Sequence, residues 1–422
     1  MSGNSDRAAR LRAEMVAYLR ERGRLGDPRV AAALGQVPRH VFVSGAELPE
    51  AYADRAVVTH YRDGVPTSSA SQPTVVAMML EQLRPPVGGR VLEIGAGTGY
   101  NAALLSVLVG PSGRVVTIDI DPDVAGEART HLAEAGVTNV EVICGDGAVG
   151  WASSAPYDGI IVTAGASDLA PAWIGQLAPE GRLVLPLSIR AVQHCVAFTW
   201  ANGTHADGHL RSVSVREGGF MPLTGAISNS DIRLPVPRHP GVYVLAAQGT
   251  KVDTGLVADA LDDRRPRADL GITAPGSEVA GSLRRWLAFR DNSAASLAYL
   301  GPPEGADASG VPPLLRYTIH GVTRRSSPCI LGPAGLAVLD RASPRTTVGD
   351  AHHTVLDLAT RACGEANQEA IRLGELVTGW DAANRPGPDR LRIDAYPSGT
   401  TPPSIEGLAH PARHATFVVE SS

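Results

Sequence analysis

Strand-like apolar runs alternate with helical periodicities over the first half of the chain. The run 91–94 has the pattern of a buried strand, and an apolar helical pattern begins at Ala102. Four later runs share the strand pattern: 114–119, 140–144, 157–163 and 183–186. Upstream, apolar positions at helical spacing predict a helix over 7–22, a second from Pro28 and a third from Pro73. This alternation predicts an α/β fold built on a parallel sheet.

Three glycines, Gly95, Gly97 and Gly99, separate the first of these strands from its helix. Glycines let backbone approach a ligand closely, and the start of a helix offers unpaired N–H groups. Tyr100 stands where a dinucleotide fingerprint has its last glycine, and Glu93 would repel a pyrophosphate but attract a cationic ligand. The turn resembles motif I of S-adenosylmethionine (SAM)-dependent methyltransferases; a generic glycine-rich turn or an NAD site is the alternative.

A hydroxyl-rich loop at 67–73 leads into the third predicted helix. Its serines have two interpretations. Serine is a good capping residue, so Ser69 and Ser71 could serve only to start a helix that has Pro73 in its first turn. Alternatively, the hydroxyls hold a substrate carboxylate beside the glycine turn. The residues alone leave both interpretations open.

Four short motifs occur in a fixed order: Val-Pro-Arg-His at 37–40, Ala-Tyr-x-Asp at 51–54, Ser-Gln-Pro at 71–73 and Val-Leu-Glu-Ile-Gly-x-Gly-Thr-Gly-Tyr at 91–100. With the strands that follow, and Phe-Met-Pro-Leu at 220–223, they make residues 10–223 resemble protein-L-isoaspartate O-methyltransferases.

The resemblance implies a Rossmann-like class I SAM-dependent methyltransferase domain that uses S-adenosyl-L-methionine and releases S-adenosyl-L-homocysteine. An acid after the second strand would hydrogen-bond the ribose hydroxyls. The residues expected to contact the cofactor are Glu93, Gly95, Gly97, Thr98, Gly99, Asp119, Ile120, Asp146, Gly147 and Thr163. The residues expected to orient the acceptor are Ser71, Ser69 and Ser68.

Two features depart from the minimal repair enzyme. The segment 67–73 is unusually rich in serine, and some 200 residues follow the matching part. Both features resemble the isoaspartyl-methyltransferase homologues of lanthipeptide and graspetide pathways. That resemblance implies methylation of an aspartate side chain in a ribosomally made, cyclised peptide, leading to aspartimide and then to isoaspartate. Repair of isoaspartyl proteins is the alternative, and a SAM-binding protein without catalysis is a third hypothesis.

The family resemblance, the proline-rich polar stretch at 229–240 and the apolar pattern beyond it divide the chain into four parts. We expect an N-terminal helical segment with the substrate loop over 1–85, the methyltransferase domain over 86–225, and a linker over 226–240. A C-terminal α+β domain for substrate recognition is expected over 241–422. Within it the pattern predicts these elements: strands at 241–247, 314–319, 330–339, 391–396 and 416–419, and helices at 278–289 and 351–380.

Charge and composition indicate which classes of partner and site are not expected. The net charge of −5 carries no nucleic-acid footprint, and no apolar run is long enough to span a bilayer. The four cysteines are far apart, so neither a zinc site nor a disulfide framework is expected. We expect His205 and His209 in a loop or hairpin tip, and His352 and His353 to be surface or capping residues. The arginine clusters at 264–267 and 324–325 are expected at the solvated surface, and contact with an acidic leader peptide is the alternative. We expect a cytoplasmic enzyme that acts on a peptide; the sequence indicates no oligomeric state.

Overall fold

The computed structural model describes residues 2–62, 65–201, 208–220, 232–302, 311–312, 314–319, 322–342, 354–400, 402 and 408–421. The chain forms two compact units. Unit 1 comprises Met1–Ser188, Gln193–Asn229 and Arg392–Ser422, and unit 2 comprises Ile189–Val192 and Ser230–Leu391.

The centre of unit 1 is a parallel sheet with a doubly wound order. Its strands are β3 (Arg90–Ile94), β4 (Arg114–Asp119), β5 (Val140–Cys144), β6 (Tyr157–Val162) and β7 (Leu177–Ile189). They lie in the order β5-β4-β3-β6-β7, with β3 paired in parallel to both β4 and β6. The chain therefore reverses its direction of winding between β3 and β6, which is where such sheets bind ligands. The predicted α/β class is confirmed.

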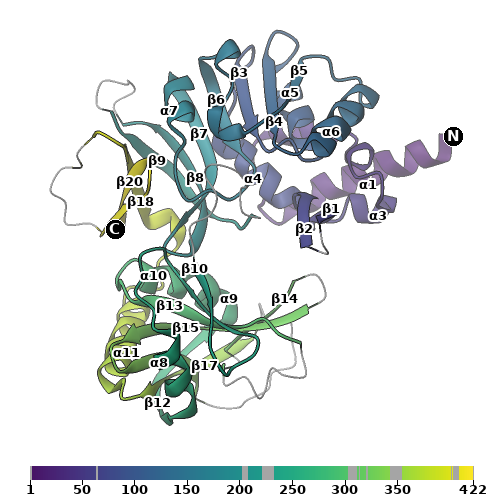
Figure 1. Ribbon diagram of the computed structural model, residues 1–422. Coiled ribbons are helices and arrows are strands. Elements are labelled where there is room, and N and C mark those ends of the chain that lie inside the picture. The colour runs from purple at the N-terminus through teal and green to yellow at the C-terminus, as the bar shows by residue number, and fades with distance from the viewer. Residues whose placement is uncertain are drawn as a thin grey trace. The chain divides into compact units, whose positions relative to one another are not determined.

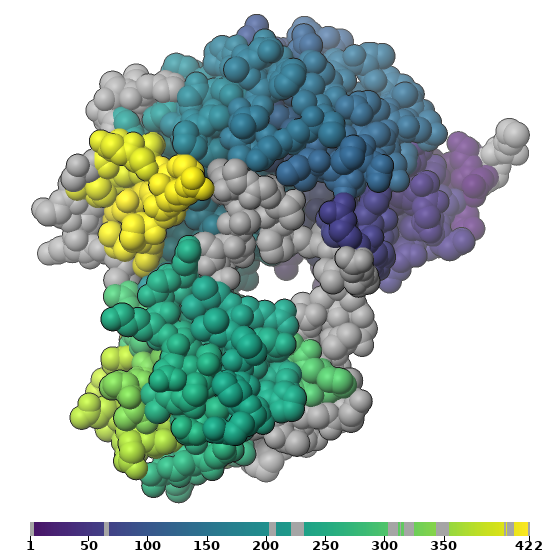
Figure 2. Space-filling model, viewed as in Figure 1, coloured from purple at the N-terminus to yellow at the C-terminus, as the bar shows by residue number. Residues whose placement is uncertain are grey.

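Antiparallel strands extend this sheet beyond β7. They are β8 (Val192–Trp200), β9 (Leu210–Glu217), β18 (Leu391–Pro397), β19 (Leu408–Pro411) and β20 (Ala415–Ser421), in the order β8-β9-β18-β20-β19. The last residues, yellow in Figure 2, thus belong to the sheet of unit 1. The sequence analysis instead assigned everything from 241 to 422 to one C-terminal domain. Local pattern identified the strands but not their partner, because antiparallel pairing joins Asp394 to Arg211, which lies far away in sequence.

Helices cover the parallel strands of unit 1 (Figure 1). They are α1 (Ser2–Glu21), α2 (Pro28–Gln36), α3 (Leu48–Ala51), α4 (Pro73–Leu83), α5 (Tyr100–Val109), α6 (Pro122–Glu134) and α7 (Pro171–Gln176). The predicted start of α2 is confirmed, since the Asp27 side chain accepts the Arg29 N–H and Pro28 is the first helical residue. A hairpin of β1 (Val57–Arg62) and β2 (Val65–Ala70) precedes α4.

Unit 2 is a mainly antiparallel sheet with helices on both faces. Its strands are β10 (Ile232–Pro235), β11 (Val242–Ala246), β12 (Arg264–Pro275), β13 (Ala294–Tyr299), β14 (Leu315–Ile319), β15 (Val322–Gly332), β16 (Gly335–Arg341) and β17 (Val355–Gly364). Its helices are α8 (Thr254–Asp262), α9 (Gly276–Glu278), the π-helical turn Val279–Leu283, α10 (Arg284–Ala288) and α11 (Asn367–Ala382). Leu336 and Val338 of β16 join one apolar cluster, and Ala337 and Leu339 join another. Both faces of this sheet are therefore core.

Two predictions for this half were wrong. The stretch 351–380 was expected to be one helix, but Val355–Gly364 is the strand β17, and the helix α11 begins only at Asn367. Strand β17 lies between β16 and β12 and is buried on both faces, so its apolar residues do not reveal a period of two. The expected linker 226–240 contains the edge strand β10.

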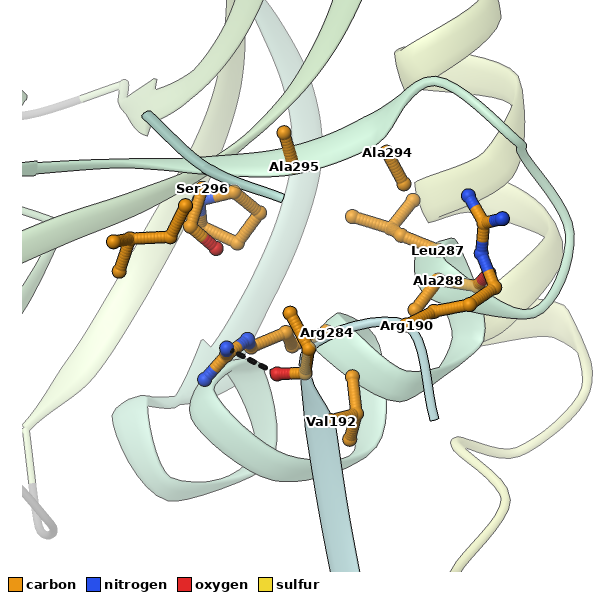
Figure 3. A pocket seen from close by; sticks show the side chains of 11 residues that line it. Arg190, Val192, Arg284, Leu287, Ala288, Ala294, Ala295 and Ser296 are labelled. Atoms are coloured by element: carbon orange, nitrogen blue, oxygen red, sulfur yellow. Dashed lines mark hydrogen bonds between the residues drawn. The ribbon is translucent and has the colours of Figure 1, made fainter. Parts of the chain in front are cut away.

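The arginine cluster at 264–267 contacts acids, whereas Arg325 of the other cluster is buried and not at the surface as expected. Arg265 contacts Asp263 and Glu365, and Arg267 contacts the buried Asp340. A small hollow in the same unit has two further arginines in its wall (Figure 3). Arg190 donates to the carbonyls of Ala288 and Asp291, and Arg284 donates to that of Ala191. These guanidinium groups support the backbone around the hollow.

An ion pair made by the C-terminal strand β18 is expected to contribute to the stability of unit 1. Arg211 donates to both carboxylate oxygens of Asp394, whose side chain is only 4% exposed. We expect Asp394→Asn to lower the free energy of unfolding by about 1.5–3 kcal/mol, because a hydrogen-bonded charge is lost. Glu50→Gln removes a comparable but exposed pair with Arg55 and should cost about 1 kcal/mol or less. Urea denaturation measures both, and equal effects would contradict the assignment.

Candidate active site

The glycine turn joins β3 to α5 at the point where the winding reverses. Gly95, Gly97 and Gly99 all have positive φ, at 98°, 51° and 86°. The N–H groups of Gly95 and Ala96 both donate to the carbonyl of Ile118 at the end of β4. The turn is therefore fixed to the neighbouring strand, and α5 begins behind it at a glycine without a side-chain cap.

The surroundings show what two of these glycines are needed for. A Cβ at Gly95 would lie 2.6 Å from Oγ1 of Thr163, which itself donates to the Gly95 carbonyl at 2.6 Å. Gly95 is thus required by packing against the end of β6. At Gly97 a Cβ would meet only the Ser69 carbonyl at 3.9 Å and Ser68 Oγ at 4.0 Å. Gly97 is the glycine that faces the serine segment.

Asp119, at the end of β4, holds the turn from the other side. Its Oδ2 accepts the Gly97 N–H at 3.0 Å and its Oδ1 accepts the Asp121 N–H at 3.1 Å. Burial raises the pKa of this carboxyl, and the two backbone N–H groups oppose that rise. An ionised carboxylate has about four acceptor positions in all, and its contact with a ribose remains a prediction.

The remaining expected cofactor residues lie at the ends of the neighbouring strands. Ile120 follows Asp119 and is 45% exposed, an apolar side chain open to solvent. Asp146 follows β5 and accepts the Ala148 N–H at 2.9 Å. A Cβ at Gly147 would lie 2.4 Å from the side chain of Ile94, so this position needs glycine. The Thr98 carbonyl accepts a hydrogen bond from His131 Nδ1 at 3.0 Å.

Glu93 is placed differently from the other residues of this set. It is fully buried, and its two oxygens accept hydrogen bonds from Asn101 Nδ2 at 2.8 Å and Thr117 Oγ1 at 2.6 Å. The sequence analysis expected a direct contact with a cationic ligand. The carboxyl is instead enclosed between β3, β4 and α5, so that it supports the turn from beneath.

The serine segment is a strand and a short connection rather than the loop expected. Strand β2 ends at Ala70 and pairs with β1 through Val58 and Ser69. Ser68, Ser69 and Ser71 are half-buried. The N-cap residue of α4 is Gln72, and the carboxylate that accepts the Thr74 N–H belongs to Asp54. The start of this helix is thus stabilised by an aspartate from another segment.

Sequence reasoning missed the residues that support this segment. Arg39 is fully buried and donates to the Ser71 carbonyl at 2.8 Å, and Asp54 accepts hydrogen bonds from Gln72 and Thr74. The motifs at 37–40 and 51–54 carry the family resemblance, but the sequence analysis assigns no role to their residues. Their joint presence with Ser-Gln-Pro was the available signal, because in the structure all three motifs meet.

The doubly wound sheet with a glycine turn at its switch point and acids at the ends of the next strands defines a class I SAM-dependent methyltransferase fold. Residues 10–227 match the sequence model of the protein-L-isoaspartate(D-aspartate) O-methyltransferase family. The chain belongs to this family, whose members are SAM-dependent carboxyl O-methyltransferases.

Individual proteins are similar to this chain to different extents. The protein-L-isoaspartate O-methyltransferase of Methanoregula boonei is 43% identical over 199 residues, which are 47% of this chain and 86% of that one. A solved protein-L-isoaspartate O-methyltransferase structure is 22% identical with a TM-score of 0.49, covering 91% of this chain and 96% of its own. Another, from Plasmodium falciparum in complex with S-adenosyl-L-homocysteine, is 21% identical with a TM-score of 0.42 and covers 49% and 95%.

The described residues also bear on two other kinds of site, a membrane span and a metal centre. No helix among them is long and apolar enough to cross a bilayer. Likewise, over the described ranges, no group of three or more His, Cys, Asp or Glu side chains is placed to hold a metal ion. His209 stacks on Tyr396, whereas His205, His352 and His353 lie outside the described residues, as do residues 221–223 of the last motif.

Glu93 gives this site a pH-dependent stability. Burial raises the pKa of Glu93 from 4.5 to about 7, against the opposing hydrogen bonds from Thr117 and Asn101. The folded state therefore binds this proton more tightly than the unfolded state. The stabilisation is complete below about pH 4.5 and is lost as the pH rises to about 7.

We expect Glu93→Gln to remove this dependence. The free energy of unfolding of the variant relative to the wild type should rise by about 3 kcal/mol between about pH 4.5 and pH 8, since each pKa unit is worth about 1.4 kcal/mol. Denaturant unfolding at a series of pH values measures the difference. Parallel curves for the two proteins would contradict the assignment.

Proposed function

We propose that this chain transfers the methyl group of SAM to the free carboxylate of an L-isoaspartyl residue in a peptide or protein. The observation that carries the proposal is the approach of Ser68 and Ser69 to Gly97, within the glycine turn of the switch point. This approach supports a site in which the cofactor binds at the glycine turn and the acceptor binds at the serines, with Gly97 between them. The family match supports the isoaspartyl acceptor.

The residues present fit the cofactor. Gly97 leaves open the space that a side chain would occupy, α5 starts without a side-chain cap, and Asp119 and Asp146 follow adjacent strands. We assign the amino-acid part of SAM to the turn 95–99, the ribose to Asp119, and the adenine to Ile120, Asp146 and Gly147. Thr163 shapes the turn by its bond to the Gly95 carbonyl.

Methyl transfer in this site requires that the protein position the acceptor carboxylate against the methyl group. SAM, when bound, supplies a methyl group already activated by the sulfonium. An aspartyl-type carboxyl has a reference pKa near 3.9, so the acceptor is an anion at neutral pH and requires no general base. Aligning the reacting atoms and excluding water is worth up to about 7–11 kcal/mol. The serine hydroxyls and nearby backbone N–H groups donate to the carboxylate without fixing it in a salt bridge.

A second candidate acceptor is the side chain of an ordinary aspartate in a modified, ribosomally made peptide. The serine-rich sequence at 67–71 and the presence of unit 2 favour it. Methylation would then lead to aspartimide, because the ester is a better electrophile than the carboxylate. In this version unit 2 recognises a cyclised precursor.

The preferred acceptor distinguishes methylation of an isoaspartyl residue from methylation of an ordinary aspartate. The purified protein is incubated with SAM and with matched peptides containing isoAsp-Gly or Asp-Gly, the latter both linear and cyclised. We expect a mass increase of one methyl group on the isoaspartyl peptide. Dehydration of the cyclised Asp-Gly peptide alone would favour the tailoring function. Methylation of none of the peptides would contradict the isoaspartyl proposal.

Two substitutions test the division between cofactor and acceptor sides, each serving as the other's control. Ser71→Ala should lower kcat for methyl transfer while leaving the Kd for SAM unchanged, because the hydroxyl acts on the acceptor. Asp119→Ala should weaken SAM binding by about 1.5–3 kcal/mol, the value of hydrogen bonds to a charged partner. Calorimetry and initial rates measure both. Equal losses of binding and turnover in Ser71→Ala would contradict its role.

A further inference from the structure

Arg39 is a buried cation that contacts the backbone of the serine segment. The whole residue has 0% exposure. Its Nη2 donates to the carbonyls of Ser71 at 2.8 Å and Ala70 at 3.4 Å, and its Nε donates to that of Ala51 at 2.8 Å. One side chain thus ties the end of β2 to the segment that contains Asp54.

Asp54 holds the other end of the same connection. Its Oδ2 accepts hydrogen bonds from Gln72 Nε2 at 3.1 Å and Thr74 Oγ1 at 2.7 Å, and its Oδ1 accepts the Thr74 N–H at 2.9 Å. Arg39 and Asp54 therefore bracket Ser71, one through the carbonyls before the turn into α4 and one through the groups after it.

The cost of burying Arg39 indicates that its position matters. Among the described residues no carboxylate lies within ion-pair distance of its guanidinium, and Nη1 has no hydrogen-bond partner. The guanidinium lies 4.8 Å from the ring centre of Tyr100, the first residue of α5. A buried charge without an ion pair is expensive, even with carbonyl groups, Tyr100 and the more distant Asp54 to compensate it. In return, Arg39 connects the serine segment to the helix that follows the glycine turn.

We propose that Arg39 and Asp54 are positioning residues that clamp the connection 70–74, so that the serine hydroxyls meet the acceptor carboxylate in a fixed geometry beside Gly97. The proposal rests on the proposed function, since it assigns the acceptor to the serines. Neither residue needs to touch the substrate: they act through the backbone carbonyls, the Gln72 amide and the Thr74 groups that they bind.

The variant Arg39→Lys distinguishes the effect of the hydrogen bonds made by Arg39 from the effect of its positive charge. Lysine keeps the positive charge but lacks the planar fork that reaches carbonyls on two segments. We expect kcat for the isoaspartyl peptide to fall by about 10- to 100-fold, as displacement by about 1 Å does, with the Kd for SAM unchanged. Arg29→Lys is the matched control, because Arg29 Nη2 also donates to two carbonyls, those of Pro85 and Leu108. It should leave kcat unchanged.

Hydrogen–deuterium exchange of the full-length protein tests the clamp independently of activity. Amides of residues 67–76 should exchange faster in Arg39→Lys than in the wild type or Arg29→Lys. Asp54→Asn gives a second route if the arginine variant does not fold, since it replaces an acceptor of Gln72 with an amide of the same shape. It should raise exchange in the same residues and lower kcat.

The outcomes are distinct for the two proposals. Unchanged exchange and unchanged kcat in Asp54→Asn, or a loss of SAM binding equal to the loss of kcat in Arg39→Lys, would overturn the clamp. A wild-type protein that methylates no isoaspartyl peptide would overturn the proposed function. Faster exchange in the two variants would in that case still support the clamp as a property of the fold.

Discussion

The site depends on two pieces of backbone, the glycine turn and the serine segment, that are held side by side at Gly97. Gly97 lies in the turn at the switch point, and a side chain there would project toward Ser69 and Ser68. The turn is held by the Ile118 carbonyl and the Asp119 carboxylate, and the serine segment is held by Arg39 and Asp54. Because each piece has its own supports, their separation is set by the fold and not by a contact between them.

The supports are buried polar groups, and this determines how the site responds to change. Glu93 and Arg39 are fully buried and Asp119 is half-buried, and the protein compensates all three with hydrogen bonds. Removing one partner of such a group is costly because the other loses its compensation. The same burial raises the pKa values of Glu93 and Asp119, which couples the stability of this unit to pH.

The C-terminal half of the chain is divided between the two units. Residues after 391 return to unit 1 as β18–β20, and the Asp168 carboxylate accepts the His414 N–H at 2.7 Å. Unit 2 is therefore an insertion within the fold of unit 1 and not an appendage at its end. Its sheet has core on both faces, which is sufficient for a compact unit with its own apolar clusters.

The sequence by itself determined the parallel strands, the glycine turn and the family, because these depend on short contiguous runs whose spacing records the backbone geometry. It also identified the serines and the motifs at 37–40 and 51–54. Only the tertiary structure decided that Arg39 and Asp54 meet the serine segment, that Glu93 lies beneath the turn, that β17 is a strand and that β18–β20 extend the sheet of unit 1. Each of these depends on a partner distant in sequence or on burial from both sides, and local periodicity records neither.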